Sequence, residues 1–242
     1  IYYHSPDSLP SFINDYYVGL METTPRETRW VFHTENSIPL VNFIDLPYTP
    51  WSDNKYYPVF GVPSPLLMSW PDLYFHTQLL TADMLDPTVF RRCAMTTTLA
   101  AIELANAGPA ETQTIMREVA TRSQFRLGQI ALNASGEDGL ARKRLRHIAQ
   151  RDQRAIESAL RLVLPYELNQ NPEIQVTKTR LQTSIANRLN EVTTWLDPDN
   201  TESMEYEPGT VVPNRMVERD PPGLAGTDYW DLYEMSEEMH TA

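Results

Sequence analysis

The chain has 242 residues, 41% of them hydrophobic and 10% aromatic, which is enough apolar material to bury the core of one or two domains. Its formal net charge of −12 argues against a nucleic-acid partner, because binding to phosphate needs a clustered positive field. No apolar run approaches the roughly 18 residues of a membrane-spanning helix, so no membrane span is expected.

Residues 1–107 alternate between helical and strand-like patterns. Helices are expected at 9–21 and 53–60, and strands at 29–34, 39–44 and 62–70. The last strand is expected to be a buried core strand, because it is a continuous apolar run bounded by Gly and Pro. The alternation predicts the α/β fold class: a partial mixed or parallel sheet with flanking helices.

Longer helical patterns fill residues 87–196. Helices are expected at 87–107, 109–134, 138–164 and 172–195, with Pro at or near several starts. The short connections predict antiparallel neighbours, so residues 108–196 are expected to form an α-helical bundle. The lone cysteine, Cys93, is expected to be a small buried residue of the first helix; it rules out an intrachain disulfide and leaves cytoplasmic and secreted locations open.

Residues 197–242 form a third region, predicted to be an irregular acidic arm rich in Pro and Gly. The formal charges of 1–107, 108–196 and 197–242 are −6, +4 and −10. We expect the arm either to pack back on the basic region or to lie solvated beside it. Three aromatic residues would anchor it: Tyr229, Trp230 and Tyr233.

His76 is the main candidate for chemistry. It follows the expected strand 62–70 and precedes a helix start at Asp86-Pro87, where Asp is a favourable cap and Pro suits the first turn. In open α/β sheets, ligands and metals gather beyond the carboxyl ends of the strands. A single histidine at such a place is, on spacing alone, more often a surface or hydrogen-bonded residue than a metal ligand.

Three motifs surround this histidine: G-V-P-S at 61–64, W-P-D-x-x-x-H-T at 70–77 and D-x-x-D-P at 83–87. In this order and spacing they resemble the last third of the co-catalytic zinc aminopeptidases, the family that includes glutamate carboxypeptidase and glutaminyl cyclase relatives. The turn at 47–54 lies where that family has a G-S-D-H turn, and 8–12 resembles the start of the helix before it. The resemblance covers roughly residues 1–107.

The resemblance implies a hydrolase that removes N-terminal residues from peptides with two zinc ions. In the family, two histidines and three carboxylates hold the ions and a glutamate is the general base. His76 matches the final ligand, while the other ligands and the base lie upstream of the matching region. The expectation is therefore that this chain holds no catalytic residue, is inactive alone, starts arbitrarily at Ile1, and needs a missing N-terminal part or a companion chain.

Four residues are candidates for substrate binding. By resemblance, Ser52 and Asp53 would line the active-site wall, although Asp53 at a helix start is first of all expected to be a capping residue. Tyr48 and Phe75 would form an apolar pocket for the terminal residue of a peptide, with ordinary packing an equally good interpretation.

Two departures from the family pattern favour a rival interpretation. Asn54 stands where the family has a histidine, and Leu80 stands where it has an aspartate. If that aspartate steadies the histidine loop, its loss either loosens the ligand or passes the task to Asp83. The rival is a non-catalytic scaffold or dimerisation module in which helices 109–196 form a homodimer. A third interpretation is a cyclase or other acyl-transfer relative, because the same metal site can serve it.

Overall fold

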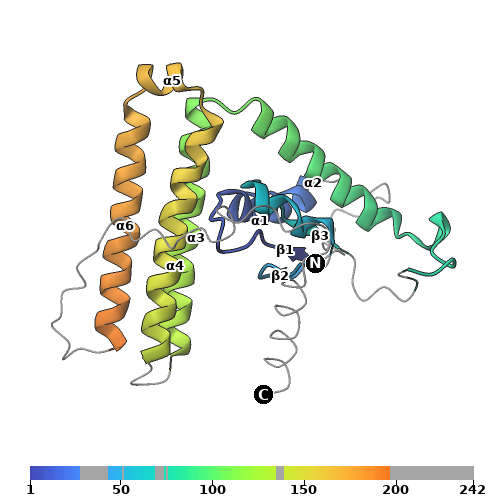
Figure 1. Cartoon of the computed structure of the whole chain (residues 1–242), viewed down its shortest axis with the longest axis horizontal. Helices are drawn as coiled ribbons and strands as arrows, with labels where there is room; N and C mark the ends of the chain where they lie inside the picture. The colour runs from blue at the N-terminus through green and yellow to red at the C-terminus, as the bar shows by residue number, and fades with distance from the viewer. Residues whose placement is uncertain (28–42, 51, 69–73, 75, 135–138, 197–242) are drawn as a thin grey trace.

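The computed structural model describes residues 1–27, 43–50, 52–68, 74, 76–134 and 139–196 (Figure 1). The expected strand 29–34, Phe75 and the acidic arm 197–242 lie outside these residues. None of the described helices combines the length and the apolar character that a membrane crossing requires.

Three long helices form the predicted bundle: α3 (Pro109–Asn133), α4 (Gly139–Ser158) and α6 (Glu173–Leu196). All three pack against one another and lie side by side in Figure 1. Each helix buries one stripe of side chains, as amphipathic helices must. The fully buried members of this core are Met116, Val119, Leu127, Leu145, Ile156, Ala159, Ile174, Ile185 and Val192.

The connection between α4 and α6 differs in detail from the expected pattern. The predicted helix 138–164 ends as a 3₁₀ turn, η4 (Ala159–Leu162), and a short helix that was not predicted, α5 (Pro165–Gln170), follows it. Pro165 occupies the first turn of α5, where its missing N–H leaves no hydrogen bond unmade. The four helices expected at 87–107, 109–134, 138–164 and 172–195 are otherwise confirmed as α2, α3, α4 and α6, close to their expected bounds.

The N-terminal portion is built around α1 (Ile13–Glu27) and α2 (Pro87–Ala105), which pack against each other. Its small core is Tyr2, Tyr17, Val18, Met21 and Ala100. The Tyr2 and Tyr17 rings are stacked, with centroids 5.3 Å apart. Cys93 on α2 is only partly buried, so the prediction of a buried position is wrong. Among the described helices, α1 is the one that packs closely on α2.

A three-stranded sheet joins this portion, in the order β2-β1-β3. The central strand β1 (Tyr2–Tyr3) pairs in parallel with β2 (Asp45–Leu46) and antiparallel with β3 (Leu66–Leu67). The mixed sheet was therefore predicted correctly. The long buried strand at 62–70 was not: of its described part, 62–68, two residues form β3, both half-buried, and Val62 is 49% exposed.

The prolines explain the shortened strand. Pro63 and Pro65 have no N–H to give to a neighbouring strand, so ladder pairing can begin only after them. The helix expected at 53–60 is present as two 3₁₀ turns, η1 (Asp53–Lys55) and η2 (Tyr57–Phe60). Gly61 ends η2 with φ of +73°, in the left-handed region that glycine tolerates.

Candidate functional site

His76 lies on an exposed turn between β3 and α2. Thr77 N–H donates to the Tyr74 carbonyl over 3.0 Å, which closes the turn, and Thr77 Oγ1 donates to the same carbonyl over 2.7 Å. His76 takes the third position of this turn with φ of +59°, and it is the one non-glycine residue with positive φ in the described part of the chain. That conformation is uncommon for a side chain with a Cβ, and such residues concentrate at functional sites.

The described residues do not fit a zinc ion by themselves. No group of three or more His, Cys, Asp or Glu side chains within them lies close enough together to hold a metal. A catalytic zinc needs about three protein ligands, so His76 alone does not make a site. Asp83, the candidate replacement for the missing aspartate, is exposed, and a hydrogen bond from the Thr81 side chain holds the pKa of its carboxyl below the usual range.

The candidate substrate-binding residues occupy the turn before η1. Tyr48 is half-buried, whereas Ser52 and Asp53 are exposed. Ser52, and not Asp53, takes the cap position of η1, and its side chain makes no capping hydrogen bond. Phe75, the fourth candidate, lies outside the described residues.

Asn54 has a structural task at this turn. Its side chain is buried; its Oδ1 accepts from Ser52 N–H over 3.1 Å, and its Nδ2 donates to the Thr49 carbonyl over 3.0 Å. An Asn side chain that bonds the backbone two residues away is a common way to stabilise a turn. The departure from the family's histidine therefore serves the shape of the turn that carries Ser52 and Asp53.

A second polar cluster was not anticipated from the sequence. Arg126 of α3 donates through Nη1 to Asp15 Oδ1 over 2.5 Å and through Nη2 to Asp15 Oδ2 over 2.9 Å. The same guanidinium donates to Asp152 Oδ2 of α4 over 2.8 Å. The Asp15 and Asp152 side chains are only 7% and 2% exposed. Burial alone would lower the pKa of Arg126, but its hydrogen bonds to Asp15 and the two negative charges raise it.

Arg151 extends this cluster to the N-terminal loop. It donates to Asp152 Oδ1 over 2.8 Å and to Asp7 Oδ1 over 3.1 Å, and His147 Nε2 lies 3.1 Å from Asp7 Oδ2. Burial would raise the pKa of the Asp7 carboxyl, but the charge of Arg151 and the hydrogen bond from His147 lower it. We call Asp7, Asp15, Arg126, Arg151 and Asp152 the arginine–aspartate cluster.

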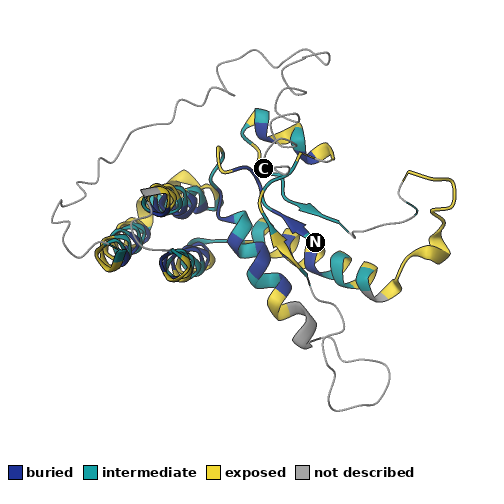
Figure 2. Ribbon diagram, turned by 90° about the horizontal axis from the view of Figure 1, so that it is seen from below, coloured by how far each residue is buried: buried dark blue, intermediate teal, exposed yellow. Residues whose placement is uncertain are grey.

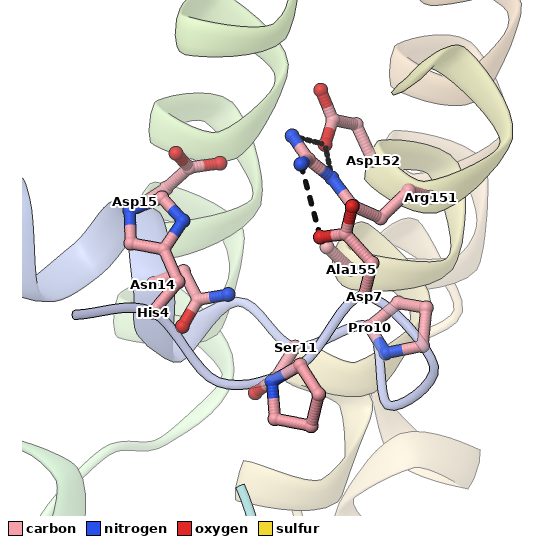
Figure 3. A pocket seen from close by; sticks show the side chains of 10 residues that line it. His4, Asp7, Pro10, Ser11, Asn14, Asp15, Arg151, Asp152 and Ala155 are labelled. Atoms are coloured by element: carbon pink, nitrogen blue, oxygen red, sulfur yellow. Dashed lines mark hydrogen bonds and ion pairs between the residues drawn. The ribbon is translucent and has the colours of Figure 1, made fainter. Parts of the chain in front are cut away.

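The cluster borders a small polar cavity. Figure 3 shows Arg151 reaching both Asp152 and Asp7 on one side of it, with His4, Asn14 and Asp15 on the other. The cavity volume is about 10 Å³, which suits a single water molecule and no peptide. Every carboxylate of the cluster is already bound by an arginine, so none is placed to act as a metal ligand or a nucleophile. The cluster joins segments of the chain that are far apart in the sequence.

Comparisons with known proteins do not add a relative. No protein-family model matches the chain, and neither curated proteins nor solved structures show a significant similarity to it.

Proposed function

We propose that this chain is the histidine-bearing portion of a zinc-dependent aminopeptidase-like hydrolase, with the remaining metal ligands supplied by polypeptide outside the chain. The observation that carries the proposal is the left-handed backbone of His76, at φ of +59°, on an exposed turn. An exposed histidine with this backbone supports the proposal, because residues in sparsely populated backbone conformations cluster at functional sites and histidine is a common zinc ligand.

Exposed apolar side chains of the segments 56–62 and 79–90 support a missing neighbour. Phe60 is 71% exposed, Leu79 61% and Phe90 63%. Further large apolar residues of the same region are at least 43% exposed: Tyr56, Tyr57, Val62, Leu80, Met84 and Leu85. Large apolar side chains left exposed in this number favour a protein interface, because their burial is favourable. Figure 2 shows the exposed stretch that leads into α2 on the side of the molecule opposite the bundle.

The sheet also offers places for added strands. In the order β2-β1-β3, the outer strands β2 and β3 each pair on one side within the described residues. An edge strand presents N–H and C=O groups that a further strand can pair with. A companion segment that extends the sheet would cover the apolar side chains and bring its own carboxylates and histidine toward His76.

Zinc content tests this proposal. In the complete assembly, His76→Ala should remove at least one of the two zinc equivalents measured by atomic emission, and peptidase activity with it. His147→Ala is the matched control, because His147 is also exposed but contacts Asp7 in the joint between loop and bundle. A wild-type assembly without zinc, or equal zinc in wild type and His76→Ala, contradicts the proposal.

The non-catalytic scaffold or dimerisation module remains the second candidate. The absence of a metal-binding group among the described residues favours it, as do exposed apolar residues at one end of the bundle: Leu132 is 77% exposed and Leu140 72%. It predicts a homodimer that contains no zinc. Light scattering on the wild type and on Leu132→Glu/Leu140→Glu decides: a dimer that becomes a monomer in the variant supports this candidate.

A further inference from the structure

The outward surface of α4 is strongly basic. The helix carries six Arg or Lys side chains against two acids, and one of those acids, Asp152, is buried in the arginine–aspartate cluster. Lys143, Arg144 and Arg146 are exposed within the first turns of the helix. These three residues are called the α4 basic face. Three exposed positive side chains within about one turn of a helix create a local positive field that attracts anionic groups.

The α4 basic face lies at the end of the bundle where the last described residue is found. Helices α3 and α6 both pack on α4, and α3 ends, α4 begins and α6 ends at the same end of the bundle (Figure 1). The chain therefore leaves Leu196 near the first turns of α4. The 46 residues that follow, 197–242, contain twelve acids and two bases. An extended chain of a few residues is long enough to reach from the end of α6 to the neighbouring start of α4.

We propose that the α4 basic face is the docking site of the chain's own acidic segment 197–242. Covalent attachment gives that segment an effective concentration in the millimolar range, which a free anionic partner rarely reaches. Nucleic acid is disfavoured as the occupant, because the chain as a whole carries a charge of −12 and repels phosphate. The inference is independent of zinc chemistry and concerns a different surface from His76.

The lysines make the proposal directly testable. The sequence contains three: Lys55, Lys143 and Lys178. Zero-length carbodiimide cross-linking of the full chain, read by mass spectrometry, should join Lys143 to an Asp or Glu of 197–242. Lys55 and Lys178 serve as internal references, since Lys55 lies over the Tyr56 ring and Lys178 is 4.0 Å from Glu157. The cross-link should fade at ~0.5 M salt, where charge interactions are screened within a few ångströms.

A charge reversal completes the test. Arg144→Glu/Arg146→Glu keeps Lys143 as the reporter and should reduce its cross-link to 197–242 several-fold. The matched control, Arg117→Glu/Arg180→Glu, reverses exposed charges on α3 and α6 and should leave the cross-link unchanged. Circular dichroism checks that both variants keep the helical fold. An absent Lys143 cross-link in the wild type, or equal cross-linking in the reversal variant, overturns the proposal.

Isotope mixing distinguishes the chain's own segment from that of a second copy. In an equal mixture of ¹⁴N- and ¹⁵N-labelled chains, docking within one chain gives cross-linked peptides of a single isotope. Mixed-isotope peptides would show that the segment docks on a second copy, and this too overturns the proposal.

Discussion

Arg126 of α3 holds Asp15 of α1 through two parallel hydrogen bonds and holds Asp152 of α4 with the same guanidinium. One side chain thus joins the N-terminal portion to two helices of the bundle. Both carboxylates are nearly inaccessible to water, so the charge of Asp15 depends on Arg126 and that of Asp152 on Arg126 and Arg151 together. Phe12 N–H adds a neutral link over 2.9 Å to Ser158 Oγ at the end of α4. The N-terminal portion is therefore fixed to the bundle at a charged joint.

Removing the guanidinium should destabilise the protein strongly. Arg126→Met leaves Asp15 buried without its cationic partner and leaves Asp152 with Arg151 alone. Breaking a buried pair in this way costs about 3 to 5 kcal/mol. Urea unfolding followed by circular dichroism measures the loss. The control is Glu191→Ala, which removes an exposed partner of Arg188 and should cost less than about 1 kcal/mol. Equal losses in the two variants would show that the joint contributes no more than a surface pair.

The outer end of the joint should respond to acid. The pKa of Asp7 is lowered in the folded chain by Arg151 and His147, so its contribution to stability is present above the unfolded pKa of about 3.9 and is lost as pH falls through the folded value. Wild type should exceed Asp7→Asn in stability at neutral pH by less than about 1 kcal/mol, because Asp7 is partly exposed. The difference should close near pH ~3.

Urea midpoints of both proteins across this pH range provide the measurement. The control is Asp53→Asn, which changes an exposed carboxylate of η1 and should change stability at neutral pH by less than about 0.5 kcal/mol. A wild-type advantage that grows as pH falls would reverse the assigned direction of the Asp7 shift.

The bundle was predictable from the sequence, and the arginine–aspartate cluster was not. Apolar residues recur at helical spacing, such as Ile115 and Val119 in α3 or Ile185 and Val192 in α6. This periodicity is enough to predict where the helices lie. The partners Asp15 and Arg126 are 111 positions apart, and Asp7 and Arg151 are 144 apart. Nothing in local spacing pairs such residues, because their meeting depends on how α1 crosses the bundle.

The N-terminal sheet was predictable in part. Its mixed character followed from the alternation of patterns, but strand length did not, since Pro63 and Pro65 limit pairing in a run that is apolar enough for a long strand. The turn at His76 was located correctly between strand and helix. Its left-handed backbone has no sequence signal, because glycine or asparagine is the usual residue there.

The core of the bundle should tolerate truncation poorly. Ile156 of α4 is fully buried among α3 and α6, so Ile156→Ala removes apolar contacts and leaves a cavity, at a cost of about 2 to 5 kcal/mol. Val176→Ala on α6 is the control: Val176 is 67% exposed, and its replacement by a better helix former should change stability by less than about 0.5 kcal/mol. Thermal and urea unfolding measure both. A small effect at Ile156 would mean that the core is loosely packed.

His76 should reveal a conflict between stability and function. Replacement by glycine removes the strain of a left-handed residue with a Cβ, so His76→Gly should raise the stability of the protein by about 0.5 to 1 kcal/mol. His76→Ala keeps the Cβ and should gain little, which makes it the matched control. Gly61→Ala is the converse variant: the added methyl group meets no neighbouring atom, but alanine is unfavourable at φ of +73°. It should lower the stability of the protein by about 1 kcal/mol.

The two readouts together separate a functional histidine from a structural one. If His76 is a ligand, His76→Gly is more stable than the wild type in urea yet loses zinc in the complete assembly, because the residue is kept at this turn for its imidazole and not for its backbone. If the imidazole instead stabilises the turn through its own contacts, His76→Gly is less stable than the wild type. A destabilised glycine variant with unchanged zinc content would assign His76 to the turn and remove the observation on which the hydrolase proposal depends.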